Sequence, residues 1–181
     1  AGRDTHPYGL RTRLLCLENT HNAAGGTVLT AAEHRTLVDT ARAHGLKVHL
    51  DGARLWHAAV ACDVPLEDLA WGVDSVMVCL SKGLGAPMGS ILCGSRDFIE
   101  QARRVRKMLG GAVRQGGVVA AAGLVALEHW PHLADDHLKA QRLAQGLRAL
   151  GFQVAPPSTN ILLVPVLDIP LALRVLEDAG I

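Results

Sequence analysis

Aromatic residues are scarce in this sequence, and several patterns that mark particular kinds of protein are missing. Only 3% of the residues are Phe, Trp or Tyr, and the 18 Lys and Arg residues nearly balance the 17 Asp and Glu residues. A basic surface with interleaved aromatic side chains is typical of nucleic-acid-binding proteins, so this composition argues against one. No apolar run reaches the roughly 18 residues of a membrane-spanning helix, and no stretch resembles a signal peptide. We therefore expect a soluble, cytoplasmic protein without a nucleic-acid or membrane partner.

Cysteine and histidine motifs are missing as well. The four cysteines include no CxxC pair, and three of them lie in apolar, strand-like runs. Free and buried thiols in a reducing compartment are therefore expected in place of disulfides or a zinc site. The nine histidines form neither an HxH nor an HExxH pattern, so no metal centre is expected.

What the sequence does have is a composition that can form a core. Of its 181 residues, 49% are hydrophobic, which suits one domain, or one domain and the beginning of another. The chain begins with Ala1 and stops at Ile181, directly after a predicted helix cap. We therefore expect it to be an internal piece of a longer protein.

Strand-like runs alternate with helical patterns in the first half of the chain. Strands are predicted over residues 13–17, 46–50, 74–80 and 89–93, and helices over 31–44, 54–61, 66–71 and 96–108. Thr30 and Glu33 form a capping box at the start of the first helix. This alternation predicts an α/β domain with a mainly parallel sheet.

The second half is predicted to be mostly helical. Helices are expected over residues 117–130, 131–150 and 170–179, and strands over 152–155 and 160–166. The first of these helices is apolar almost all round, which is typical of a buried helix. The long helix, the two strands and the final helix of residues 131–181 resemble the start of a smaller α+β domain. We therefore divide the chain into residues 1–130 and 131–181.

Polar residues follow three of the predicted strands. They are the block Glu18–Asn22, Asp51 with Arg54, and Ser81 with Lys82. Ligands of open α/β sheets gather at the carboxyl ends of the strands, where these groups would converge. A lysine directly after a buried strand is costly unless something uses its charge. Such a lysine can act as a nucleophile or form a Schiff base with an aldehyde.

Each of these residues also has an ordinary structural alternative. Lys82 taken alone could be a surface lysine past a strand end. Asp51 is either the N-cap of the next helix or a carboxylate that keeps the ring nitrogen of an aldehyde cofactor protonated. Arg54 forms either a surface salt bridge or a bidentate contact with a substrate carboxylate. Ser81 and Arg114 could donate hydrogen bonds to a phosphate.

Four blocks of the sequence resemble the low-specificity threonine aldolases, which are pyridoxal-phosphate enzymes of the aspartate-aminotransferase fold (fold type I). The blocks are Leu17–Asn22, His49–Leu55, Leu80–Ser90, and Arg106–Gly111 with Arg114 and Gln115. They match in order from about Asp4 onward, and the first and third together are specific to this family. The resemblance implies part of the large cofactor-binding domain over residues 1–130, followed by a connecting helix and the beginning of the small domain.

The resemblance also implies pyridoxal 5'-phosphate as the cofactor and assigns residues to it. Lys82 forms the imine with the cofactor, and Asp51 pairs with its pyridine nitrogen. Ser81 and Arg114 lie near its phosphate group. These assignments follow from the matching blocks alone.

Substrate residues are implied in the same way. Arg54 binds the substrate carboxylate, and Lys107 lies near an active site, that of a neighbouring subunit. His6 approaches the β-hydroxyl group and is the second catalytic residue beside Lys82. The full-length form is expected to be a homodimer or homotetramer that acts on a small β-hydroxy amino acid.

The implied reaction is the cleavage of threonine or allo-threonine to glycine and acetaldehyde. Family members contain further segments at both ends, with a phosphate clamp, a histidine that stacks on the cofactor and a second arginine. We therefore expect this chain alone to be incomplete and inactive. The alternatives are another fold-type-I β-eliminating lyase, which would release ammonia and pyruvate, and a non-catalytic truncated paralogue that only pairs with other subunits.

Overall fold

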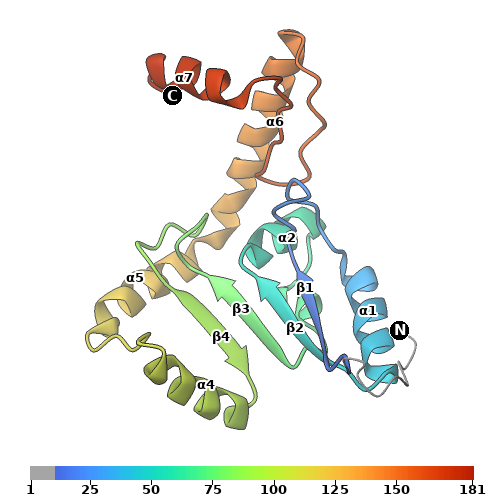
Figure 1. Ribbon diagram of the computed structural model, residues 1–181, viewed down its shortest axis with the longest axis vertical. Coiled ribbons are helices and arrows are strands. Elements are labelled where there is room, and N and C mark those ends of the chain that lie inside the picture. The colour runs from blue at the N-terminus through green and yellow to red at the C-terminus, as the bar shows by residue number, and fades with distance from the viewer. Residues whose placement is uncertain (1–10) are drawn as a thin grey trace.

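A four-stranded sheet forms the centre of the structure, a computed structural model that describes residues 11–181. The strand order is β1-β2-β3-β4 (Figure 1). β1 (Leu14–Glu18), β2 (Lys47–Gly52) and β3 (Ser75–Cys79) are parallel, and β4 (Ser90–Gly94) runs antiparallel to β3. The predicted mainly parallel sheet is therefore confirmed.

Helices connect the strands and occupy most of the second half of the chain. They are α1 (Ala31–Ala43), α2 (Leu55–Cys62), α3 (Leu66–Leu69), α4 (Arg96–Met108), α5 (Gly116–Glu128), α6 (Leu133–Ala149) and α7 (Ile169–Asp178), with a 3-10 turn η1 at Trp130–His132. The capping box at the start of α1 is confirmed: Thr30 accepts a hydrogen bond from the Glu33 amide, and the Glu33 carboxylate accepts one from the Thr30 amide.

The two faces of the sheet differ because successive side chains of a strand point to opposite sides. Val48 and Leu50 of β2 are fully buried, and they belong to the two hydrophobic clusters that α1, α2, α5 and α6 complete. His49 and Asp51 lie on the other face. There Asp51 has Met77 of β3 beside it, and both side chains are partly exposed. The helices thus cover one face, and the polar strand-end residues project from the other.

The α5 helix contradicts the prediction of a buried helix. Only Gly123 and Ala126 of this helix are buried, while Val118 is 78% exposed and Leu124 is 66% exposed. The helix packs against the core along one narrow line, where Gly123 faces the side chain of Leu80. Val119 and Leu127 are partly buried, but Val118, Leu124 and Val125 have no cover among residues 11–181. The prediction was therefore right about the helix and wrong about its burial.

Two predicted strands are also wrong. Residues 152–155 and 160–166 form neither strand nor bridge. The polar groups of these segments are satisfied in other ways: the Val154 carbonyl accepts a hydrogen bond from Arg148 Nε at 2.7 Å, and the buried Thr159 donates one to the Gly26 carbonyl at 2.8 Å. A strand needs a neighbour with which to pair, and none of the described residues supplies one here.

The cysteines are free, as predicted, but they are not buried. Cys16 and Cys93 are exposed, and Cys62 and Cys79 are half-buried. Cys16 lies on the uncovered sheet face of β1 and Cys93 on β4, which are the two edge strands, so an apolar neighbourhood in the sequence did not become burial in the fold. Within residues 11–181, no helix combines the length and the apolar character needed to cross a membrane.

The long helix α6 leads away from the sheet. Figure 1 shows it running from the side of the sheet that holds α5 to the far end of the molecule, where α7 lies across its top. The segment between these two helices returns to the sheet, because Thr159 contacts Gly26 in the loop after β1. Residues near the C-terminus therefore lie next to the carboxyl end of the first strand.

Candidate active site

The carboxyl ends of the three parallel strands bring the predicted polar residues together. Glu18 at the end of β1 lies directly beside Asp51 of β2 in the sheet register. The Asn19 amide donates a hydrogen bond to the Asp51 carbonyl at 2.9 Å. The buried Asn19 side chain in turn holds the following loop through Leu29, accepting from its amide at 3.1 Å and donating to its carbonyl at 2.9 Å. The loop after β1 is therefore fixed against the end of β2.

Asp51 keeps one carboxylate oxygen available. Its Oδ1 accepts a hydrogen bond from the Ala53 amide at 3.0 Å, which orients the half-buried side chain. Its Oδ2 has no hydrogen-bond partner within residues 11–181. The N-cap of α2 is Arg54, without a side-chain cap, so Asp51 does not have the helix-capping role that was its structural alternative. The geometry leaves a fixed carboxylate that can accept one more proton donor.

Lys82 lies in a loop that is stabilised by hydrogen bonds between its own backbone groups. The Gly85 amide donates to the Lys82 carbonyl at 2.9 Å, and the Ala86 amide donates to the Leu80 carbonyl at 3.1 Å. Gly85 has a φ of +78°, in the left-handed region that favours glycine. The Lys82 side chain is exposed and has neither a hydrogen bond nor an ion pair with any residue between 11 and 181. Lys82 thus combines a fixed backbone with an amine that has no partner there.

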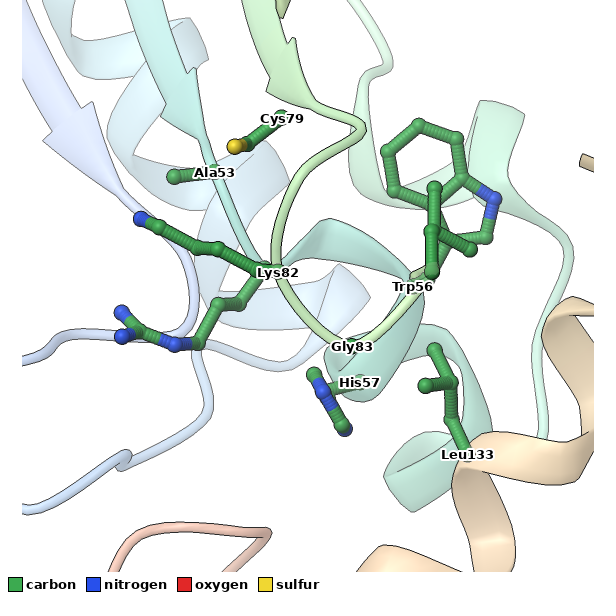
Figure 2. Close-up of a pocket in the computed structure, with 9 residues that line it drawn as sticks. Ala53, Trp56, His57, Cys79, Lys82, Gly83 and Leu133 are labelled. Atoms are coloured by element: carbon green, nitrogen blue, oxygen red, sulfur yellow. The ribbon is translucent and has the colours of Figure 1, made fainter. Parts of the chain in front are cut away.

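Arg54 and Lys82 line the same small pocket. Figure 2 shows the Lys82 side chain running from its loop toward the end of β2 at Ala53, away from His57 and Leu133. Arg54 is half-buried and, like Lys82, has no carboxylate partner in the described part of the chain. Two cations without anions beside them favour an anionic ligand, because a guanidinium group and an ammonium group bind carboxylates and phosphates well.

The other predicted site residues lie elsewhere or outside the description. Ser81 is exposed, and its hydroxyl is 3.4 Å from the Cys79 sulfur. Lys107 is in the last turn of α4, and Arg114 lies just before α5; both are exposed, and neither lines the pocket that holds Lys82. His6 falls outside the described residues. The roles implied for these four residues stay predictions.

A buried histidine pair adjoins the pocket: His57, which lines it, and His137. The sequence placed both residues in predicted helices and gave them no role. His57 of α2 is 2% exposed, and its Nδ1 is 3.0 Å from Nε2 of His137 in α6. Burial, together with the neighbouring His137, lowers the pKa of His57 from 6.5 to about 4. The two residues are 80 positions apart, and no spacing rule connects such distant positions. Their pairing could only be found in three dimensions.

Metal-binding geometry is missing from the described site. Among residues 11–181, no group of three or more His, Cys, Asp and Glu side chains is placed to hold an ion.

These features define an α/β protein in which a lysine, an arginine and an oriented carboxylate lie at the carboxyl ends of the parallel strands, as a candidate site for an anionic ligand. The chain belongs to the beta-eliminating lyase family, whose model matches residues 2–168. Enzymes of this family depend on pyridoxal 5'-phosphate, and the fold is that of the aminotransferase-like enzymes that use this cofactor.

Comparison with individual proteins gives the same result. The chain is 50% identical to low-specificity L-threonine aldolase 1 of Arabidopsis thaliana over 161 residues, 87% of this chain and 45% of that protein. It is 45% identical to the low specificity L-threonine aldolase of Escherichia coli K12, over 86% of this chain and 46% of that protein. A solved threonine aldolase of Leishmania major superimposes with a TM-score of 0.77 at 27% identity, covering 92% of this chain and 49% of that one. The chain spans about half the length of these relatives.

Proposed function

We propose that the protein containing this chain is a threonine aldolase that cleaves β-hydroxy amino acids such as threonine or allo-threonine to glycine and an aldehyde. One observation carries the proposal. Arg54 and Lys82 line one pocket, next to the end of β2 that carries Asp51, in a chain that is 50% identical to a low-specificity L-threonine aldolase.

The residues present fit pyridoxal 5'-phosphate. Lys82 has an amine without a partner that would hold the cofactor aldehyde covalently, and Asp51 Oδ2 would accept the proton of the ring nitrogen. When bound, the cofactor supplies the sink for the electrons that are released as the carbon–carbon bond breaks. A carboxylate at the ring nitrogen strengthens that sink because it stabilises the protonated ring. The Ala53 amide, bonded to Asp51 Oδ1 at 3.0 Å, keeps the carboxylate aimed in one direction.

Arg54 is the substrate-binding residue in this proposal. Its planar guanidinium can hold a carboxylate through two parallel hydrogen bonds, which orients the amino acid as well as binding it. Orientation matters because the bond to be broken must be held in one geometry for the reaction to proceed. The roles of His6 at the β-hydroxyl group, of Ser81 and Arg114 at the phosphate, and of Lys107 at a neighbouring subunit's site belong to the same proposal.

The organisation of the whole protein is also part of the proposal. Residues 1–130 would contribute to the cofactor-binding domain, and residues 131–181 would form the connecting helix and the beginning of a second domain. The course of α6 away from the sheet supports this division (Figure 1). We further propose a homodimer or homotetramer in the cytoplasm, where the free cysteines would remain reduced.

Product analysis tests the function. A protein containing this chain, incubated with threonine, should release glycine and acetaldehyde. Treatment with borohydride in the presence of the cofactor should leave a cofactor adduct on the peptide that contains Lys82. Ammonia and pyruvate from serine, without acetaldehyde from threonine, would assign the protein to the β-eliminating lyases that act by elimination. If neither set of products forms, that result would support a non-catalytic paralogue.

Substitutions separate the roles of the residues. Lys82→Ala should reduce acetaldehyde release to the uncatalysed background and abolish the adduct, whereas Lys139→Ala, an exposed lysine of α6, should change neither. Arg54→Gln should raise KM by about 10- to 150-fold, since a hydrogen bond to a charged group contributes about 1.5–3 kcal/mol. An Arg54→Gln enzyme with an unchanged KM would remove Arg54 from the substrate site.

A further inference from the structure

The backbone directly after Lys82 is held from behind by side chains of three elements. A Cβ atom built on Gly83 would lie 2.6 Å from His57 Nε2 of α2 and 2.8 Å from Leu133 Cδ2 of α6. His132 of η1 has its Nε2 at 3.3 Å from the Gly83 carbonyl. Figure 2 shows His57 and Leu133 on the side of Gly83 that is opposite to the Lys82 side chain. Only a residue without a side chain fits between them and the lysine.

His57 in turn is held by the α6 helix. Its Nδ1 lies 3.0 Å from His137 Nε2, and the two rings stack with centroids 5.2 Å apart. In the neutral pair one ring donates and the other accepts, according to the tautomers. His57 Nε2, which faces Gly83, is buried without a hydrogen-bond partner in the described residues. The contact between His57 and Gly83 is therefore one of shape, and the hydrogen bond to His137 fixes the ring that makes it.

We propose that the His57–His137 pair is a positioning device for Lys82, which fixes the lysine by clamping the backbone of Gly83 between α2 and α6. The proposal deepens the function proposed above, because it concerns the residue that would bind the cofactor. Lys82 has no side-chain partner within residues 11–181, so its place in the pocket depends on its backbone. The clamp is where that backbone meets the rest of the fold.

The contact between His57 and Gly83 requires an uncharged imidazole ring. The charged and titratable groups around His57 are His137 and Asp136 of α6, His132 of η1, Arg54 at the start of α2, and Lys82 across the pocket. Burial, His137, Arg54 and His132 lower the pKa of His57, and Asp136 alone opposes them; burial also lowers the pKa of His137. Both rings are thus neutral near pH 7. A proton added to His57 would place a buried charge beside Gly83 and require an N–H group at Nε2, whichever tautomer the neutral ring has, although no acceptor for it lies within residues 11–181.

The test measures the chemical state of Lys82 itself, without cofactor or substrate. In the cofactor-free protein, trace acetylation followed by peptide mass spectrometry gives the labelling rate of each lysine, and its dependence on pH gives the apparent pKa of Lys82. His57→Ala should change the labelling rate of Lys82 at least threefold relative to Lys47 and Lys139, which serve as internal references. His137→Ala should change it in the same direction, and the double variant should change it no more than His57→Ala alone, because the two residues act as one unit.

His34 provides the matched control. It is fully buried in α1, its Nε2 is 2.9 Å from the Trp71 carbonyl, and its Nδ1 has no partner in the described residues. His34→Ala therefore removes an equally buried histidine with one bonded nitrogen that is not among the side chains packed against Gly83, and it should leave the labelling of Lys82 unchanged. His57→Asn, which can keep a hydrogen bond to His137, should restore part of the wild-type rate.

Two results would overturn the proposal. One is an unchanged labelling rate and apparent pKa of Lys82 in a folded His57→Ala or His137→Ala protein; the more exposed His137 keeps the test open if His57→Ala does not fold. The other is an equal change in His34→Ala, which would show a general loosening of the fold. The outcome is independent of catalysis: a protein without aldolase activity would refute the proposed function, while the labelling would still decide whether the pair positions Lys82.

Discussion

The helices α2 and α5 are similar in composition and opposite in environment. Both consist mainly of alanine, valine and leucine, yet five of the eight residues of α2 are buried and only two of the 13 residues of α5. The helix α2 lies in the connection from β2 to β3 and packs against the sheet and α6, whereas α5 comes after α4, which follows the edge strand β4 (Figure 1). An apolar composition indicates that the side chains of a helix favour burial. Whether other residues of this chain bury them depends on where the helix lies relative to the sheet.

Matched leucine substitutions should show the largest difference between the two helices. Leu55 of α2 is 3% exposed and Leu124 of α5 is 66% exposed. Leu55→Ala should reduce the free energy of unfolding by about 2–5 kcal/mol, because a core leucine loses both burial and packing. Leu124→Ala should change it by less than about 0.5 kcal/mol. Urea denaturation of the 181-residue chain measures both changes in unfolding free energy. A comparable loss for the two variants would show that α5 is covered in solution.

Acid should destabilise the side of the molecule that holds α2. The pKa of His57 is about 4 in the folded chain and about 6.5 when unfolded. Between these values the unfolded chain binds more protons, so the contribution of neutral His57 is complete above pH 6.5 and is lost as the pH falls toward 4. Hydrogen exchange at pH 7 and pH 4.5, corrected for intrinsic rates, should show protection lost in α2 before α1. A His57→Phe variant should lose this pH dependence.

Removing a helix cap should cost a similar free energy of unfolding in the packed helix α1 and in the exposed helix α4. Thr30 caps α1 in the packed part of the fold, and Ser95 accepts from the Phe98 amide at the start of the exposed α4. Replacing either by alanine removes a partner of a helix N-terminal amide, at a cost of about 0.5–2 kcal/mol. Thr30→Ala and Ser95→Ala should therefore lower the unfolding free energy by similar amounts. A cost confined to Thr30→Ala would mean that α4 does not unfold together with the sheet.

The smallest effects should come from two helical glycines. A Cβ on Gly146 of α6 would meet nothing within 4 Å, whereas one on Gly123 of α5 would lie 2.9 Å from Leu80 Cδ1. Alanine is favoured over glycine in a helix by about 0.5–1 kcal/mol. Gly146→Ala should therefore raise the midpoint of thermal unfolding, and Gly123→Ala should raise it less or lower it. An equal gain at both positions would indicate that α5 is not seated against Leu80.

Local sequence signals predicted the helices and strands of the sheet region well, but they predicted the burial and the pairing of elements less well. The capping box at Thr30 and the strand predicted over residues 46–50 depend on neighbours in the chain, and both are confirmed. The convergence of Glu18, Asp51 and the Lys82 loop also followed from the rule for strand ends. The burial of α5 and the strands at residues 152–155 and 160–166 depended on partners that no local pattern specifies.

The candidate site was predictable to the same extent. Asp51 and Lys82 each follow an apolar run, so they could be picked out one strand at a time. His57 could not, because its significance comes from His137 and Gly83, and a histidine on a helix has many ordinary roles. Sequence reasoning therefore found the polar residues that directly follow the strands and missed the histidine pair, which depends on a contact between distant helices.

The hydrogen bond from Thr159 to the Gly26 carbonyl has a consequence for synthesis on the ribosome. The two residues are 133 positions apart, and chains elongate at about 5–20 residues per second. The loop after β1 therefore exists for roughly 7–27 s before the residue that caps it has been made. β1, β2 and β3 emerge within that interval and can pair in the order in which they are synthesised. The strand-end loop would then be the last part of this edge of the sheet to reach its final form, closed by a segment translated long after it.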